Sequence, residues 1–386
     1  MKLIAYYEGT DQTKVWLETV LGRSDIEFRK LPTQNISTAF TKLPAYISDI
    51  LYLDKPDVVL AGSLDGRHER PIFSIEFASC TPQYQHALQR FSRMMASVVN
   101  SCPSVIIMPE RKRENDGGVR LYKRSQSIEY GAVRLMDIYR TPAFVMDWPD
   151  DDGILQNEAQ TGLPLLNCDS MRHLGQLLRD SIAQFYNVDY IGALWRLPIV
   201  KSLVDITRMR AYDKGAPSIS RPGGGQGAKS KSNLDLFPTS ALISEIEKKS
   251  QSHKAQIKKI SDFIRNREES LVFYPTRVTK HAGDPYVGMI GYYDIAFCRT
   301  GPTTRDRGYN LVAHCKGVSI DEINKSMTGF YEKKCPFSED ASTADLERYS
   351  YHLKYGCKLT KSKPSRIYAE LADLVIFDDG LLYNVG

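Results

Sequence analysis

The stretch Pro56-Asp57-Val58-Val59-Leu60, followed by Pro71-Ile72-Phe73-Ser74-Ile75-Glu76-Phe77-Ala78, decides the fold of this chain. Each half is a short apolar run, typical of a buried strand, and each carries one carboxylate, Asp57 or Glu76. Burying an acidic side chain is costly unless a partner compensates its charge. A hairpin through residues 62–70 would bring the two carboxylates together. Because Mg²⁺ prefers carboxylate oxygens, the pair predicts a magnesium site.

A helix is predicted over residues 83–99, after Thr81-Pro82 ends the second strand. Its apolar face carries Leu88, Phe91, Met95 and Val98. Its polar face, which would look toward the carboxylates or an anionic substrate, carries Gln85, His86, Gln89, Arg90 and Arg93. A buried strand over residues 105–108 follows. The order strand, strand, helix, strand is that of an α/β core with its site at the strand ends.

These residues resemble the PD-(D/E)XK nuclease superfamily and, within it, the type II restriction endonucleases. The matching pieces are Pro56-Asp57, Ser74-Ile75-Glu76-Phe77-Ala78 and the helix segment His86-Ala87-Leu88-Gln89-Arg90, all within residues 45–110. The resemblance implies that Asp57 and Glu76 bind Mg²⁺, with the Phe77 carbonyl as a third ligand. It also implies that a nearby positive charge helps to polarise the attacking water.

The sequence departs from the family pattern at Ala78, where the family has Lys. In the family this charge can move to the neighbouring helix, or Glu or Gln can replace the Lys. We expect Arg90 to supply the charge here, with Gln89 as the second candidate. In the competing interpretation the carboxylates are structural, and Glu76 pairs with Arg67, Arg70 or Arg90.

Composition indicates a globular protein of a reducing compartment. The chain has 386 residues, enough for two or three domains, and a mildly positive net charge of +5 that is compatible with a polyanionic partner. Its seven cysteines form no C-x-x-C pair, which argues against a zinc ribbon or a disulfide framework. The first apolar run is too short for a signal peptide, and no run is long enough to span a membrane. We therefore expect a soluble cytoplasmic protein.

We predict an α/β (mixed α+β) fold in three parts. Residues 1–213 form a restriction-endonuclease-like catalytic core, with a mixed central sheet flanked by helices. Residues 214–236 form a flexible loop rich in Gly, Ser and Lys, whose Lys229 and Lys231 would contact phosphates. Residues 237–386 form a second, β-rich region with one long helix, which would recognise DNA.

The remaining elements are predicted from periodicity and capping signals. Helices are expected over residues 10–21, 36–53, 171–186, 200–209 and 239–267. Strands are expected over residues 2–7, 133–139, 143–146, 289–299, 309–316 and 368–377. The acidic turn at residues 149–153 is expected to be solvated rather than to hold a metal.

The second half contains a pattern of residues that is similar to the first carboxylate pair but matches the family motif less well. Asp294 lies on one predicted strand, and His314 and Lys316 on the next keep the D/E-x-K spacing, which makes an alternative catalytic set. Because His is a poor ligand for Mg²⁺, we prefer a hairpin to a second catalytic site. A hairpin that contacts DNA and a purely structural hairpin are equally favoured. Arginine suits guanine edges and phosphates. The DNA-binding candidates are Arg299, Arg305, Arg307, Lys316, Lys229 and Lys231.

The expected function is that of a Mg²⁺-dependent, sequence-specific endodeoxyribonuclease of type II restriction type, which hydrolyses DNA phosphodiester bonds. Its expected partners are double-stranded DNA, a second copy of the chain in a homodimer, because one site cuts one strand, and a cognate DNA methyltransferase acting on the same site. The alternatives are another PD-(D/E)XK nuclease of repair or antiphage defence, a catalytically inactive DNA-binding protein, and a metabolic α/β enzyme with a coincidental carboxylate pair.

Overall fold

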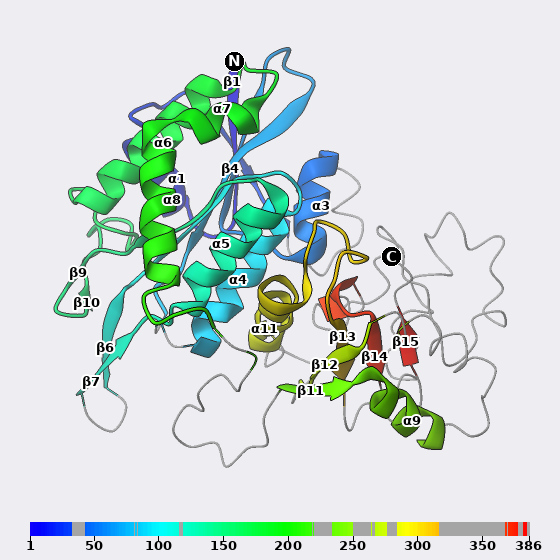
Figure 1. Ribbon diagram of the computed structural model, residues 1–386. Helices are drawn as coiled ribbons and strands as arrows, with labels where there is room; N and C mark the ends of the chain where they lie inside the picture. Colours follow the sequence, from blue (N-terminus) through cyan, green and yellow to red (C-terminus); the bar gives the residue numbers. More distant parts are fainter. Residues whose placement is uncertain are drawn as a thin grey trace. The chain divides into compact units, whose positions relative to one another are not determined.

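The chain forms two compact units, Met1–Pro217 and Ser218–Gly386, and each is described here by itself (Figure 1). The computed structural model describes residues 1–32, 43–80, 82, 84–115, 119–217, 219, 234–249, 264, 267–275, 284–315, 367–368, 370–376 and 381–383. The predicted loop at residues 214–236 lies for the most part outside these ranges, and so do Lys229, Lys231 and Lys316.

The first unit is built on a six-stranded mixed sheet with the strand order β2-β1-β3-β4-β5-β8. Its strands are β1 (Lys2–Tyr7), β2 (Ile26–Lys30), β3 (Val58–Ser63), β4 (Glu69–Phe77), β5 (Ser104–Met108) and β8 (Ala143–Asp147). Strand β3 is antiparallel to both of its neighbours, whereas the other adjacent pairs are parallel. The start of β3 therefore lies at the edge of the sheet where the other five strands end.

Helices cover both faces of this sheet (Figure 1). They are α1 (Asp11–Leu21), α3 (Ala45–Leu53), α4 (Tyr84–Val98), α5 (Ser127–Tyr139), α6 (Asp169–Gln184), α7 (Tyr190–Arg196) and α8 (Pro198–Ala211). Two neighbouring residues of β4 identify the faces, because successive side chains of a strand point in opposite directions. Phe77 packs edge-on against Trp16 of α1, with ring centroids 5.0 Å apart, whereas Glu76 contacts α4.

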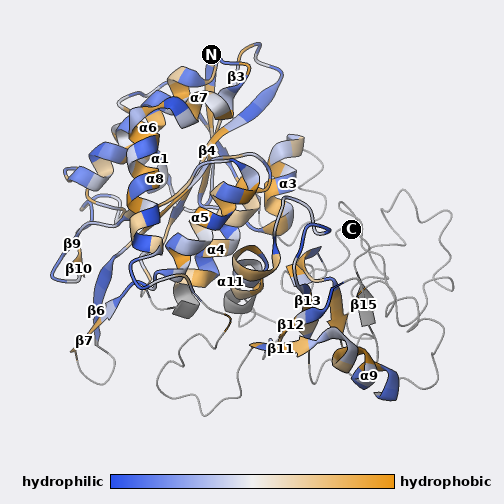
Figure 2. Ribbon diagram, in the orientation of Figure 1, coloured by the Kyte–Doolittle hydropathy of each residue, from blue (hydrophilic) through white to orange (hydrophobic). Residues whose placement is uncertain are grey.

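The core lies between the sheet and these helices. All side chains of β3 and β5 are buried, and Figure 2 shows apolar residues along the strands and polar residues on the outward helix faces. Strands covered on both faces read as continuous apolar runs, which is why they were recognisable in the sequence. None of the helices in the described ranges is long and apolar enough to cross a membrane.

The mixed α/β sheet flanked by helices is confirmed in this unit, with strands at residues 2–7, 105–108 and 143–146 and helices at 10–21, 83–99, 171–186 and 200–209, each to within a few residues. The strand predicted over residues 133–139 is wrong, because these residues belong to α5. Its apolar side chains are buried against α4, α8 and β8, and a short apolar run does not distinguish a buried helix from a strand. Helix α3 begins at Ala45, directly after Pro44; residues 36–42 of the predicted helix lie outside the described ranges.

Two hairpins extend the end of the sheet that bears the start of β3. They are formed by β6 (Arg111–Asn115) with β7 (Val119–Lys123), and by β9 (Asp150–Asp151) with β10 (Ile154–Leu155). The predicted acidic turn is the tip of the second hairpin. Its carboxylates pair with arginines of β6 instead of facing only solvent: Asp150 lies 3.1 Å from Arg111, and Asp152 bonds Arg113.

The second unit contains a five-stranded sheet with the order β11-β12-β13-β14-β15. Its elements are β11 (Leu234–Pro238), α9 (Thr239–Lys249), β12 (Glu269–Phe273), α11 (Asp284–Tyr293), a π-helix (Asp294–Cys298), β13 (Asn310–His314), β14 (Leu374–Ile376) and β15 (Leu381–Tyr383). Strands β12, β13 and β14 run parallel, and the two outer strands are antiparallel to their neighbours.

Three predictions for this unit need correction. Residues 289–298 are helical, not a strand, so the predicted strand pair with residues 309–316 does not exist; only β13 is a strand. This segment is apolar on every side because it is buried on every side, so its periodicity carried no signal. The predicted last strand is confined to β14 in its described part, and Tyr368 is helical. Helix α9 begins at Thr239 as expected, but Arg267 is not helical.

The close approach of α4 and α5 allows a stability prediction. A Cβ atom at Gly131 of α5 would lie 2.5 Å from Cε2 of Phe91 on α4, which is closer than Cβ atoms pack. Gly131→Val should therefore lower the free energy of unfolding by about 1–3 kcal/mol, as overpacking does. Urea denaturation measures the change, and Ser202→Val at an exposed position of α8 is the control for valine in a helix. Equal losses in both variants would contradict the packing explanation.

Candidate active site at the ends of strands β3 and β4

The two carboxylates singled out in the sequence lie side by side at the edge of the first unit's sheet. The β3–β4 ladder pairs Val58 with Ile75, which places Asp57 opposite Glu76. The Asp57 amide donates to Glu76 Oε2 at 3.3 Å, and the Phe77 amide donates to Asp57 Oδ2 at 2.7 Å. Each carboxylate thus accepts a backbone hydrogen bond from the other strand's end, which fixes both side chains.

Helix α4 brings two arginines to this pair. Arg93 Nη1 lies 2.5 Å from Glu76 Oε1 and 3.4 Å from Asp57 Oδ1, so one guanidinium nitrogen contacts both acids. Arg90 Nη1 lies 3.1 Å from the same Glu76 oxygen. Residues three apart share one face of a helix, which explains why both arginines reach the pair. The Nε atoms of Arg90 and Arg93 are buried and have no hydrogen-bond partner.

The pair is enclosed on the Glu76 side and open on the Asp57 side. The Glu76 side chain is 1% exposed, whereas Asp57 keeps 22% of its side-chain surface exposed. Burial raises the pKa of Glu76 to about 8; Arg93 opposes the shift and the charge of Asp57 adds to it. Burial also raises the pKa of Asp57, again against the effect of Arg93. Without further positive charge, the site therefore disfavours full ionisation of both acids.

A third acid, Asp54, also interacts electrostatically with Arg93. It is 1% exposed, accepts a hydrogen bond from the Lys55 amide at 2.7 Å and bonds the hydroxyl of Ser92 on α4. Burial opposes the charged form of Arg93, but Glu76, Asp54 and Asp57 together raise its pKa. Asp54 was not predicted as a site residue, and Arg93 was predicted only to lie on the polar face of the helix, not to pair with both carboxylates. The available signals were the position of Arg93 three residues after Arg90 and that of Asp54 three residues before Asp57.

The donor set fits a hard divalent cation held in part by water. Arg93 Nη1 already places a positive charge between the two carboxylates, at the position where a shared cation would lie. Mg²⁺ is commonly bound through one or two carboxylates and keeps several waters. Within the described ranges no group of three or more His, Cys, Asp or Glu side chains is placed to hold a metal. A cation here would thus depend on Asp57 and Glu76, with the Phe77 carbonyl as the third ligand that the resemblance implies, and on movement of Arg93.

The other predicted catalytic residues divide between the two units. Arg90 contacts Glu76, as the competing structural interpretation also expected. The side chain of Gln89, half-buried on α4, makes no hydrogen bond to either carboxylate among the described contacts. In the alternative set, Asp294 is fully buried in the π-helix, and His314 at the end of β13 lies 5.6 Å from the Tyr274 ring, between centroids.

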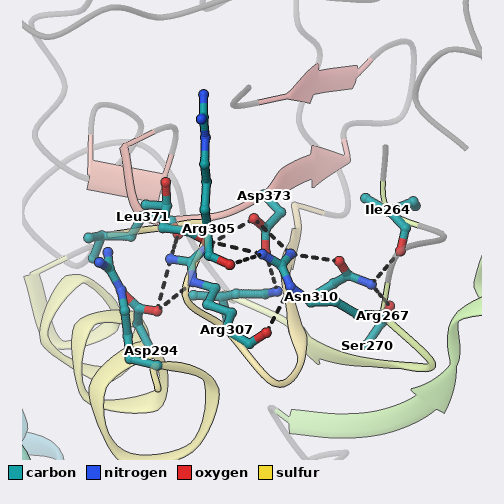
Figure 3. Close-up of polar contacts among 12 residues, drawn as sticks. Ile264, Arg267, Ser270, Asp294, Arg305, Arg307, Asn310, Leu371 and Asp373 are labelled. Atoms are coloured by element: carbon teal, nitrogen blue, oxygen red, sulfur yellow. Dashed lines mark hydrogen bonds and ion pairs between the residues drawn. The ribbon is translucent and has the colours of Figure 1, made fainter. Parts of the chain in front are cut away.

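The proposed DNA-binding arginines of the second unit are mostly internal (Figure 3). Arg299 and Arg307 are each 6% exposed, and each lies 2.8 Å from a carboxylate oxygen of Asp294. Arg307 also lies 3.0 Å from Asp373, which pairs with Arg267 at 3.3 Å. These placements contradict a strand hairpin that offers Arg299 and Arg307 to DNA. Arg305 is exposed, and its side chain points away from this network in Figure 3.

Comparison with known proteins does not assign the chain to a family. The chain matches no family model, no curated protein and no solved structure. The likeness to PD-(D/E)XK nucleases therefore rests on the short motifs of the sequence, and the chemistry of the site has to be argued from its own geometry.

The shared guanidinium of Arg93 leads to a prediction about stability. Arg93→Met leaves two buried carboxylates without their common partner and should lower the free energy of unfolding by about 3 kcal/mol or more. Arg90→Met, the matched control, removes only the longer contact to Glu76 and should cause a smaller loss. Adding Glu76→Gln to Arg93→Met should recover part of the stability. Urea denaturation at neutral pH tests the series, and equal losses for Arg93→Met and Arg90→Met would refute the shared-partner assignment.

Proposed function

We propose that this protein is a Mg²⁺-dependent endodeoxyribonuclease of restriction type, whose site is formed by Asp57 and Glu76. The observation that supports it best is the convergence of two carboxylates on one cationic nitrogen at the open edge of the sheet. Carboxylates that hold a cation, beside arginines able to bind a phosphate, are the groups that phosphodiester hydrolysis requires. The partial exposure of Asp57 gives the substrate a side from which to approach.

In this proposal each residue has a defined task. Asp57 and Glu76 hold the cation and are themselves oriented by the backbone amides of Phe77 and Asp57. A bound Mg²⁺ supplies Lewis-acid chemistry, acidifying a water and offsetting charge on the phosphate oxygens. Arg93 would leave the carboxylates to make room for the cation and would contact the scissile phosphate, and Arg90 would take the role of the Lys that the family has at the position of Ala78. Asp54 remains as the fixed partner that keeps Arg93 charged near the site.

Sequence recognition, in this proposal, belongs to the second unit, which includes the basic segment with Lys229 and Lys231. Arg305, Lys229, Lys231 and Lys316 remain candidates for contacts with DNA. Arg299 and Arg307 are left out because Asp294 binds both. Cutting both strands of a duplex would require a homodimer, since each copy carries one carboxylate pair. A cognate methyltransferase acting on the same site would protect the host DNA.

One observation favours a second candidate, a DNA-binding protein whose core has lost its chemistry. Arg90 and Arg93 together already neutralise the carboxylate pair without any metal. If these contacts are permanent, the site is a structural ion-pair cluster and Ala78 marks the loss of catalysis. Incubating the protein with plasmid DNA with and without Mg²⁺ separates the candidates. Discrete fragments indicate a restriction enzyme, a smear indicates another nuclease of repair or antiphage defence, and retardation without cutting indicates a binding protein.

The catalytic proposal predicts a specific pattern among carboxylate variants. Asp57→Asn and Glu76→Gln should each reduce Mg²⁺-dependent cleavage by at least about 100-fold, because each removes an ionised ligand of the metal. Binding of duplex DNA in Ca²⁺ should change little in either variant. Asp151→Asn is the matched control, since this exposed carboxylate lies at the acidic hairpin, away from the pair. Cleavage at the wild-type rate by either Asp57→Asn or Glu76→Gln would show that the chemistry lies elsewhere.

A further inference from the structure

The hairpin of β6 and β7 is an exposed, strongly basic ribbon with no core of its own. Arg111, Arg113, Arg120 and Lys123 are exposed, and so are Val119 and Leu121 near the tip. The two strands form a separate two-stranded sheet, which one backbone hydrogen bond, from the Arg113 amide to the Gly153 carbonyl at 2.8 Å, joins to the hairpin of β9 and β10. Figure 1 shows the ribbon extending away from the body of the first unit. Such a ribbon stabilises the fold little, because it buries little apolar surface.

The four exposed cations of the ribbon, Arg111, Arg113, Arg120 and Lys123, fall into two groups. Arg111 and Arg113 are neutralised by Asp150 and Asp152 of the neighbouring hairpin. By contrast, the side chains of Arg120 and Lys123 have neither an ion pair nor a hydrogen bond among the contacts described for this structure. Arg111 and Arg113 thus hold the ribbon against the neighbouring hairpin, whereas Arg120 and Lys123 face solvent.

The base of the ribbon is joined to the loop that follows Glu76. Lys112 Nζ donates to the Ser79 carbonyl at 2.8 Å, and the Ser125 amide donates to the Pro82 carbonyl at 3.3 Å. Because side chains alternate along a strand, Lys112 marks the ribbon face that looks toward this loop. The register places Tyr122 opposite Lys112 and Arg120 opposite Glu114 on that same face. Arg120 therefore projects from the same face of the ribbon as Lys112, whereas Lys123, which lies opposite Arg111, projects from the other face.

We infer that the β6–β7 ribbon is a DNA-binding arm that enters a groove of the duplex beside the site, so that Arg120 on one face of the ribbon and Lys123 on the other contact the phosphates on either side of the groove. This inference rests on the proposed function, since it takes duplex DNA as the substrate of the carboxylate pair. The shape fits, because strands about 4.8 Å apart form a ribbon that a major groove about 12 Å wide admits. The charge fits as well, because unpaired cations release counterions from DNA when they contact phosphates.

The test measures binding rather than cleavage. The full-length protein is titrated into a short fluorescein-labelled duplex in Ca²⁺ at several salt concentrations, and anisotropy gives the binding constant. Arg120→Gln/Lys123→Gln should weaken binding on the order of tenfold at moderate salt and make the salt slope shallower by about 1.8, for two phosphate contacts. The control Arg196→Gln/Lys201→Gln removes the same charge from exposed positions on α7 and α8 and should leave the slope unchanged. Arg120→Lys should keep most of the affinity, because it keeps the charge.

The outcomes separate the arm from the proposed function. A wild-type protein that binds duplex but does not cut it in Mg²⁺ refutes the nuclease, while the same titrations still decide the arm. Equal binding by the ribbon variant and the wild type, or equal losses in the ribbon and control variants, overturns the arm alone. A loss that is as large on single-stranded DNA overturns the groove placement. Absence of any DNA binding by the wild type overturns both proposals.

Discussion

The interaction on which the first unit depends is the contact between buried carboxylates and the arginines of α4. Strand β3 runs against its neighbours, and this reversal puts its first residues beside the last residues of β4. Asp57 and Glu76 meet there because of this topology, and not because of their spacing in the sequence. Two acids so close and so little exposed need positive charge, which Arg93 and Arg90 supply from one helix face. The orientation of α4 on the sheet is thus fixed by charge as well as by its apolar face.

In the second unit, buried carboxylates are also paired with arginines, and both described carboxylates of this cluster are almost completely buried. Asp294 and Asp373 are both buried, and Arg267, Arg299 and Arg307 surround them (Figure 3). Asn310 joins this network to the helical backbone at Ile264 and to Ser270 of β12. Removing one member of a buried network leaves its partner's charge unpaired, which is strongly destabilising. Asp57, by contrast, keeps about a fifth of its side-chain surface exposed, so the first cluster is the more exposed of these two.

The elements around the first site were predicted from two sequence signals. The buried strands are mostly apolar runs, and α4 is polar on one side only. The same reasoning failed for residues 133–139 of α5 and residues 289–293 of α11, because a short apolar run does not distinguish a buried helix from a strand. The carboxylate pair was visible in the sequence, since an acid inside an apolar strand is rare. Arg93 and Asp54 were not assigned, because their roles depend on how α4 lies against the sheet and on the loop before β3. Those are tertiary relations that no local pattern specifies.

The charges of the first site suggest why the same residues could serve both a resting and a working state. Asp54, Asp57 and Glu76 face Arg90 and Arg93, so the fully ionised cluster carries one negative charge in excess. Burial together with this excess is consistent with the raised pKa of Glu76, which lets a proton complete the balance. A divalent cation in place of that proton changes the balance to one positive charge. A phosphodiester carries one negative charge, so its arrival beside the released Arg93 would restore neutrality. In the proposed function, electrostatics would therefore favour the binding of the cation and the phosphate together over the binding of either one alone.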